Sequence, residues 1–366
     1  MSLIRASLIS ASLASALPSR TKTLGVLETL AIGTAGGVLF YLAQLPGGVV
    51  SGAMIAVGIA GIAGRPLSVP PILTQSVLVL LGISLGSLVS MQLLRHLGDY
   101  PLTIGLLAVA TICSTFGSSL YLRRVHGWDQ TSAFLAASPG ALSQIIIFAA
   151  EKGADVPAIA VVQTVRVIIL TAALPLLLTL TGLTAASPQA PPAAIASPLG
   201  LAGLIAAALV AALLLRLIRF PVSWMFGAMF ASSLLHGMGW VDGGLPNWVR
   251  AVALVGIGTL IGARFARMKV KTMLGHLNAA LGSFGIAIAI SAIFVAVAAL
   301  TTPVRIADIL VAYAPGAMDA MLALALTLHI DPIFVGAHHL SRFLFVTITM
   351  PGIVHLFGRP QDDVDD

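Results

Sequence analysis

Residues 314–332, APGAMDAMLALALTLHIDP, indicate how the chain is organised, because residues 138–157, SPGALSQIIIFAAEKGADVP, have nearly the same pattern. Each stretch begins with a helix-breaking Pro-Gly pair, continues through small and apolar residues, and reaches an aspartate. A gapless shift of 176 positions superposes them. The paired positions are Pro139 with Pro315, Gly140 with Gly316, Asp155 with Asp331, Arg166 with Arg342 and Pro175 with Pro351. This repetition predicts two homologous halves in one chain.

The amino-acid composition indicates a membrane protein. Of the 366 residues, 58% are hydrophobic and only 9% are charged, whereas soluble domains carry about 25% charged residues. Apolar segments long enough to cross about 30 Å of hydrocarbon recur along almost the whole chain. The net charge of +6 does not indicate nucleic-acid binding, because the basic residues lie singly or in small groups between apolar segments. The single cysteine, Cys113, excludes an internal disulfide and a cysteine-based metal site.

An uncharged linker rich in proline, alanine and serine divides the chain into two sets of six apolar segments. The predicted organisation is an N-terminal tail over 1–23, a membrane repeat over 24–180, the linker over 181–197, a second membrane repeat over 198–357 and a C-terminal tail over 358–366. The Ser-rich, basic tail favours an uncleaved cytoplasmic segment over a signal peptide. Further matches between the halves are LPGGVVSGAM from Leu45 with FPVSWMFGAM from Phe220, and GISLG at 82–86 with GTLIG at 258–262.

The basic loops predict that the two repeats are inverted in the membrane. In the first half, Arg65 follows the second segment and Arg123 and Arg124 follow the fourth. In the second half, basic residues follow the first and third segments instead, at 216–219 and 264–271. Equivalent loops therefore have opposite charge bias, as inversion requires. Parallel repeats remain the alternative if all six segments of each half cross.

Inversion requires an odd number of crossings in each half, so one of the six segments must fail to cross. The Pro-Gly segment is the best candidate, because proline removes a backbone donor and glycine tolerates the break. The expected fold is an all-α polytopic membrane protein of two inverted repeats, with about ten full crossings and two broken or re-entrant segments. Broken backbone at membrane depth is tolerated where it lines an enclosed or watery cavity.

The four residues of the two breaks, Pro139, Gly140, Pro315 and Gly316, are therefore predicted to line a binding region. Half-helix N-termini there would offer unpaired N–H groups and a positive dipole end to an anion. The alternative is a packing kink beside a neighbouring helix.

The sixth segment of each half carries an aspartate and an arginine. Asp155 and Asp331, each close to a proline, are predicted to cap the helix N-terminus. Arg166 and Arg342 then lie about 16 Å along their helices, near mid-bilayer. A charge at that depth usually faces a cavity or a partner. Two interpretations stay open: the guanidinium groups recognise an anionic solute, or they satisfy carbonyl groups at the broken helices.

The halves differ at two polar positions. Asp319 stands where the first half has Ser143, and it is a candidate coupling site for H⁺ or Na⁺; the alternative is an ion pair with Arg342 or Arg166. His338 stands where the first half has Val162 and lies on the face of Arg342 at i, i+4. We interpret His338 as a second candidate for the binding site, and a hydrogen-bonded packing group is the alternative.

The duplicated PGA…D…R…P pattern and the LPGGVVSGAM-type segment opening each half resemble the AbrB family of duplicated bacterial inner-membrane proteins. The resemblance covers residues 25–357 and is more specific in the second copy, APGAMDAMLALALTLHIDPIFVGAHHLSRFLFVTITMP. It implies a multi-pass protein of the bacterial inner membrane. Members are described as transporters or regulators, and some are labelled ammonia monooxygenases.

These observations predict secondary transport of a small, anionic solute by alternating access. A membrane-embedded regulator or sensor that affects gene expression without transport is the alternative, and a membrane monooxygenase is the remote one. We expect no enzymatic activity, catalytic residue, cofactor or metal site, because the chain has no HxxxH, HExxH or CxxC motif. The expected partners are a small-molecule solute, the lipid bilayer, a coupling ion and further copies of the chain, but no nucleic acid.

Overall fold

The computed structural model describes residues 20–45, 47–88, 100–140, 142–183 and 195–357. Within these ranges the chain forms fourteen α-helices and no β-strand. The predicted C-terminal tail, the first nineteen residues and most of the predicted linker lie outside the described ranges. The all-α prediction is confirmed.

Five helices are long and apolar enough to cross a membrane. They are Thr23–Leu42, Tyr100–His126, Val156–Leu180, Pro198–Leu217 and Val270–Thr301. Four further apolar helices have 10–17 residues, and they are Gly48–Ile62, Pro71–Gly86, Asn247–Gly262 and Met318–Thr327. The fold is that of an all-α membrane protein.

The first half contains α2 Arg20–Leu42, α3 Gly48–Ile62, α4 Pro71–Gly86, α6 Tyr100–His126, α7 Gln130–Ala137, α8 Leu142–Glu151 and α9 Val156–Leu180. The second half contains α10 Pro198–Leu217, α11 Ser223–Gly237, α12 Asn247–Gly262, the 3₁₀ turn η2 Ala263–Arg267, α13 Val270–Thr301, α14 Ile306–Tyr313, α15 Met318–Thr327 and α16 Pro332–Phe357. The helices α7, α8 and α9 begin 176 residues before α14, α15 and α16. The helix order thus follows the same pattern in both halves, while common origin and inversion stay predictions.

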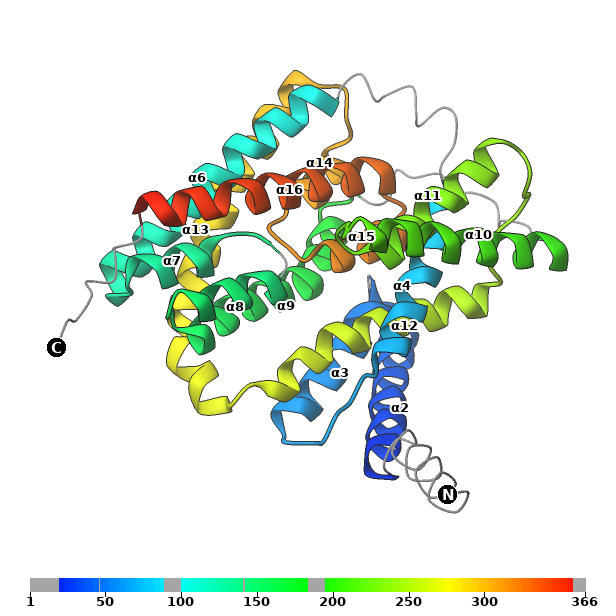
Figure 1. Cartoon of the computed structure of the whole chain (residues 1–366), viewed down its shortest axis with the longest axis horizontal. Coiled ribbons are helices and arrows are strands. Elements are labelled where there is room, and N and C mark those ends of the chain that lie inside the picture. Colours follow the sequence, from blue (N-terminus) through cyan, green and yellow to red (C-terminus); the bar gives the residue numbers. More distant parts are fainter. Residues whose placement is uncertain (1–19, 46, 89–99, 141, 184–194, 358–366) are drawn as a thin grey trace, which may run out of the picture.

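The helices fall into two groups by their contacts (Figure 1). Bundle A contains α2, α3, α4, α10, α11, α12 and η2, and bundle B contains α6–α9 and α13–α16. Each bundle therefore takes helices from both halves of the chain. Contacts between the bundles concentrate where α15, at the centre of Figure 1, packs against α4 and α12.

Glycines set the close helix crossings inside bundle A. A side chain at Gly82 of α4 would collide with the backbone oxygen of Met225 in α11, and one at Gly258 of α12 would collide with that of Val50 in α3. Small residues let helix backbones approach in this way in membrane proteins. The repeated GISLG and GTLIG motifs therefore join each half of the chain to the other.

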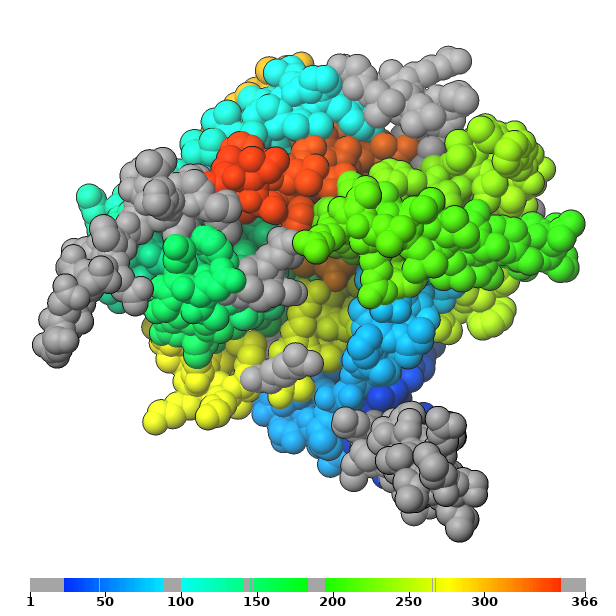
Figure 2. Space-filling view, in the orientation of Figure 1, coloured from blue at the N-terminus to red at the C-terminus, as the bar shows by residue number. Residues whose placement is uncertain are grey.

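The outer surface of bundle A is apolar. In Figure 2, α10 and α11 form the right-hand flank of the visible face. The exposed side chains of α10 include Leu199, Leu213, Leu214 and Leu217. An apolar surface of this kind suits contact with lipid hydrocarbon.

Candidate functional site

Two helices are interrupted at the Pro-Gly pairs, as the sequence predicts. α7 ends at Ala137 and α8 begins at Leu142, with Ser138, Pro139 and Gly140 outside both helices. α14 ends at Tyr313 and α15 begins at Met318. Each interruption leaves carbonyl groups at the end of one short helix and N–H groups at the start of the next without intrahelical partners.

Arg342 of α16 satisfies the open end of α14. Its Nη1 donates to the carbonyl oxygen of Ala314 at 2.6 Å, and its Nη2 donates to that of Ala312 at 2.7 Å. The side chain is only 5% exposed. A cation at this position also complements the negative end of the helix dipole.

Arg166 of α9 has the corresponding role at α7. It donates to the carbonyl oxygens of Ala137 at 3.3 Å and Ser138 at 3.5 Å, and to the side-chain oxygen of Gln163. Of the two interpretations left open by the sequence, the structure shows the contacts with broken-helix carbonyl groups. In each arginine the Nε atom is buried and has no hydrogen-bond partner.

A second polar side chain supports each interruption. Gln163 donates from Nε2 to the carbonyl oxygens of Leu135, Ala136 and Ser138 at 3.1, 3.2 and 2.8 Å. In the other half, the Nε2 atom of His339 lies 3.0 Å from the carbonyl oxygen of Val311. An amide and an imidazole thus meet carbonyl groups at equivalent places.

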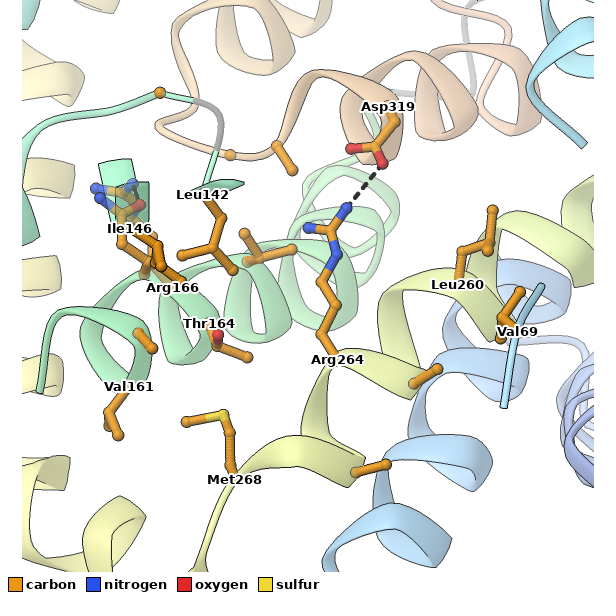
Figure 3. Close-up of a pocket in the computed structure, with 18 of the residues that line it drawn as sticks. Val69, Leu142, Ile146, Val161, Thr164, Arg166, Leu260, Arg264, Met268 and Asp319 are labelled. Carbon is orange, nitrogen blue, oxygen red and sulfur yellow. Dashed lines mark hydrogen bonds and ion pairs between the residues drawn. The ribbon is translucent and has the colours of Figure 1, made fainter. Parts of the chain in front are cut away.

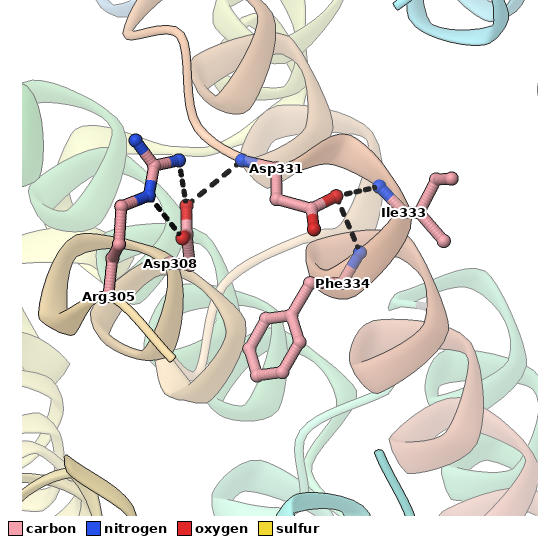
Figure 4. A network of polar contacts seen from close by, with 5 residues as sticks. All are labelled: Arg305, Asp308, Asp331, Ile333 and Phe334. Carbon is pink, nitrogen blue, oxygen red and sulfur yellow. Dashed lines mark hydrogen bonds and ion pairs between the residues drawn. The ribbon is translucent and has the colours of Figure 1, made fainter. Parts of the chain in front are cut away.

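The predicted aspartate caps are confirmed. Asp155 accepts a hydrogen bond from the Ala158 amide at 3.0 Å. Asp331 accepts from the amides of Ile333 and Phe334 at 2.8 and 3.0 Å (Figure 4). These bonds satisfy N–H groups of the first helical turn, so both aspartates have a structural role at the start of α9 and α16.

The turn before each long helix, α9 or α16, is held by the first of the two short helices that precede it, α7 or α14. Ser132 of α7 accepts from the Asp155 amide at 2.8 Å, and Asp308 of α14 accepts from the Asp331 amide at 2.9 Å. Arg305 pairs with Asp308 through two 2.8 Å bonds, as Figure 4 shows. The short helices α7 and α14 are therefore each held by hydrogen bonds near both of their ends.

A cavity of about 1370 Å³ lies between the bundles and reaches both interruptions. Bundle A contributes Leu260 and Arg264 to its wall, and bundle B contributes Leu142, Arg166 and Asp319 (Figure 3). The predicted site residues Pro139, Gly140, Gly316 and Arg342 also line it. Six of the eight predicted site residues therefore converge on this cavity, while Pro315 and His338 are not part of its lining.

Asp319 lies in the first turn of α15 and forms an ion pair with Arg264 of η2. The distance from Arg264 Nη2 to Asp319 Oδ2 is 2.9 Å, and Figure 3 shows the two side chains meeting across the cavity. The partner differs from the Arg342 or Arg166 considered from sequence, because those arginines are turned to helix carbonyl groups. In the sequence, Arg264 belongs to the basic run 264–271, which indicates membrane topology, and nothing local marks it as a cavity residue.

His338 is fully buried away from the cavity. Its Nδ1 lies 2.7 Å from the Phe334 carbonyl oxygen, and its Nε2 lies 2.8 Å from Thr103 Oγ1 in α6. Its ring also packs against Phe334, with 3.9 Å between ring centroids. These contacts are those of a packing group, whereas the neighbouring His339 lines the cavity.

The charge of the lining is strongly positive. Among the lining residues of the described chain, five are basic and one, Asp319, is acidic. The basic residues are Arg65, Arg166, Arg264, Lys269 and Arg342. No group of three or more His, Cys, Asp or Glu side chains suited to a metal ion occurs within the described ranges.

The fold and the cavity define an all-α membrane protein with two interrupted helices at one basic cavity. The family described as "Transition state regulatory protein AbrB" matches residues 49–358, and the chain belongs to this family. The resemblance predicted from the duplicated motif is thus confirmed.

Two curated relatives are similar over most of their length. "Uncharacterized protein YhjN" of Bacillus subtilis (strain 168) is 28% identical over 309 residues, which cover 78% of this chain and 79% of the relative. "Putative regulator AbrB" of Escherichia coli (strain K12) is 26% identical over 329 residues, which cover 87% of this chain and 92% of the relative.

Proposed function

We propose that the chain is a multi-pass protein of the bacterial inner membrane that transports a small anionic solute by alternating access. The observation that carries this proposal is the excess of five basic residues over one acidic residue in the cavity lining. A cleft lined by one sign of charge, with low-dielectric walls, concentrates ligands of the opposite charge. The proposal assigns no catalytic residue and no cofactor.

The interrupted helices support anion binding by their orientation. Gly140 and Leu142 at the start of α8, and Gly316 and Met318 at the start of α15, line the cavity. A helix N-terminus presents unpaired N–H groups and the positive end of the helix dipole. Two such ends at one cavity are a recurrent way to hold an anion in transporters built from broken helices.

Arg166 and Arg342 contribute to the proposed site mainly as supports. Their Nη atoms hold the ends of α7 and α14, and their positive charge remains at the cavity wall. The solute would therefore meet arginines that are already fixed in position, which lowers the entropy cost of binding.

In the proposed transport cycle, the two bundles move relative to each other. The cavity is lined from both bundles, and each bundle takes helices from both halves of the chain. Inverted repeats allow one bundle to rock or slide against the other so that the site opens alternately to either side. Arg65 and Lys269 line the cavity, and basic residues between membrane segments favour the cytoplasmic side. We therefore infer that the cavity opens toward the cytoplasm.

A thermal-shift assay followed by transport tests the proposal. We expect acetate, succinate or inorganic phosphate to raise the apparent melting temperature of the detergent-purified chain, because a ligand that binds only the folded state stabilises it. Ammonium is the matched cationic probe and should have no effect. An anion that stabilises the chain should also exchange across proteoliposomes that contain it. Stabilisation by ammonium alone, or by none of these probes, would contradict the proposal.

A regulator or sensor is the second candidate, favoured by the name of the Escherichia coli relative, "Putative regulator AbrB". Such a protein would use the same cavity to detect a solute. Binding of an anion without exchange in proteoliposomes would favour this candidate over transport.

A further inference from the structure

The Arg264–Asp319 ion pair joins the two bundles. Arg264 lies in η2 of bundle A, and Asp319 lies in α15 of bundle B. The other ion pairs found in the described ranges stay within one bundle: Arg65 with Glu28 in bundle A, and Arg305 with Asp308 in bundle B. The pair is also reachable from the cavity, since the side chains of Arg264 and Asp319 are 30% and 18% exposed.

Asp319 uses both of its oxygens at this place. Oδ2 accepts from Arg264 at 2.9 Å, and Oδ1 accepts from the backbone amide of Ala320 at 3.0 Å. An arginine and an amide of a first helical turn are the two kinds of donor that bind a free carboxylate. The side chain of Asp319 thus has the contacts expected for a bound carboxylic acid.

We propose that Asp319 is a built-in competitor at the anion site of the cavity. A small carboxylate solute would replace it on Arg264 and at the N-terminus of α15, and would thereby break the ion pair between the bundles. This inference rests on the proposed function and deepens it, because it names carboxylates as the solute class and the solute itself as the trigger for separating Arg264 from Asp319.

Other charges at the cavity agree with this assignment. Arg166 and Arg342 both line the cavity, and their guanidinium groups have hydrogen bonds to backbone carbonyl oxygens but no carboxylate partner within the described ranges. Asp319 is the one acidic side chain among the lining residues of the described chain. A site with several cations and one displaceable carboxylate suits an incoming anion better than an incoming cation.

A competitor role and a cation-coupling role for Asp319 predict opposite effects of removing this side chain on anion binding. If Asp319 binds a coupling ion, its removal abolishes ion-dependent transport and gives no gain in anion binding. If Asp319 competes with the solute, its removal strengthens anion binding, because both the competition for Arg264 and the repulsion between two carboxylates disappear.

The experiment measures the apparent dissociation constant of sodium acetate and sodium succinate for the detergent-purified full chain by ligand-dependent thermal shift, at constant ionic strength. We expect Asp319→Ala to lower the dissociation constant about tenfold, a typical effect of one charge-assisted hydrogen bond. Asp319→Asn, which keeps an oxygen for the Ala320 amide, should shift it in the same direction. Arg264→Gln should weaken binding about tenfold or more, also in combination with Asp319→Ala.

Glu151→Gln is the matched control for loss of an acid, because Glu151 is exposed at the end of α8 and does not line the cavity. Arg216→Gln is the control for loss of a basic residue, since Arg216 lies on the exposed face of α10. Neither should change the dissociation constant. If the wild type binds an anion and both Asp319 variants bind it equally or more weakly, the inference is overturned and the proposed function stands. No response to any anion in the wild type and both variants overturns the proposed function as well.

Discussion

Arg342 donates to the carbonyl oxygen of Ala314 at 2.6 Å, directly before the Pro315-Gly316 interruption. The carbonyl groups at the end of a helix have no intrahelical partner, and a buried one without a hydrogen bond is costly. A charge in mid-membrane is costly as well. The guanidinium group therefore supplies hydrogen-bond donors to the carbonyl groups, and the carbonyl groups stabilise its buried charge. This explains how an arginine and a broken helix occur together in both halves.

Arg342→Gln should lower the apparent melting temperature of the detergent-purified chain. The substitution leaves the carbonyl groups of Ala312 and Ala314 without their donor, and an unsatisfied buried group costs about 1–3 kcal/mol. We expect Arg342→Lys to recover only part of this loss, because an ammonium group lacks the planar fork that reaches two oxygens.

Arg124→Gln, at the exposed end of α6, is the control and should leave the melting temperature unchanged. A normal melting temperature for Arg342→Gln, combined with complete loss of anion binding, would assign Arg342 to direct recognition instead of support.

Gln163 and His339 should be partly interchangeable. Both donate to carbonyl groups at the end of a short helix, at 3.1 Å to Leu135 and 3.0 Å to Val311. His339→Gln should therefore reduce the melting temperature less than His339→Leu, which removes the donor altogether. Equal losses in the two variants would show that the shape of the imidazole matters more than its hydrogen bond.

The interruptions and the helix starts could be predicted from sequence because their signals are local. Proline and glycine act on the backbone at their own position, and the caps at Asp155 and Asp331 act within three residues. The shift of 176 positions added the spacing, since α7 and α14 begin at 130 and 306. Such features need no knowledge of the tertiary structure.

The partners of the polar side chains could not be predicted, because they lie far apart in the chain. Arg264 and Asp319 are separated by 55 positions, and Thr103 lies 235 positions from His338. Helical spacing placed His338 on the face of Arg342, but it could not show that α6 covers that face. The adjacent His339 lines the cavity instead.

Gly258→Ala should destabilise the chain, whereas Gly285→Ala should not. A methyl group at Gly258 would meet the backbone oxygen of Val50, but one at Gly285 of α13 has no neighbour within 4 Å. Alanine is favoured over glycine in an open helix by about 1 kcal/mol, so the control should hold or gain stability.

Gly82→Ala should also destabilise the chain, because a methyl group there would meet the backbone oxygen of Met225 in the equivalent crossing. Apparent melting temperatures in one detergent measure all three variants. Stability gains at Gly82 or Gly258 would contradict the close approach of helices in bundle A.

Cysteine labelling from either side of the membrane should distinguish inverted from parallel repeats. In a Cys113→Ser background, we expect Thr181→Cys, after α9, and Pro303→Cys, before α14, to react with an impermeant maleimide from outside. Lys152→Cys, between α8 and α9, should react only from the cytoplasmic side. All three positions are at exposed or part-exposed turns, so access by the reagent depends on sidedness and not on burial.

We expect this labelling pattern because of the distribution of basic residues. It favours the cytoplasmic side for Arg123 and Arg124 before α7 and for the run at 264–271 before α13. With those loops inside, the α7–α8 pair enters from the cytoplasm and the α14–α15 pair from outside, so the two interruptions meet near mid-membrane. Labelling of Thr181→Cys from the cytoplasmic side alone would instead require an even number of crossings in the first half. Both interrupted pairs would then enter from the same side, and a mid-membrane site with opposed helix ends would be lost.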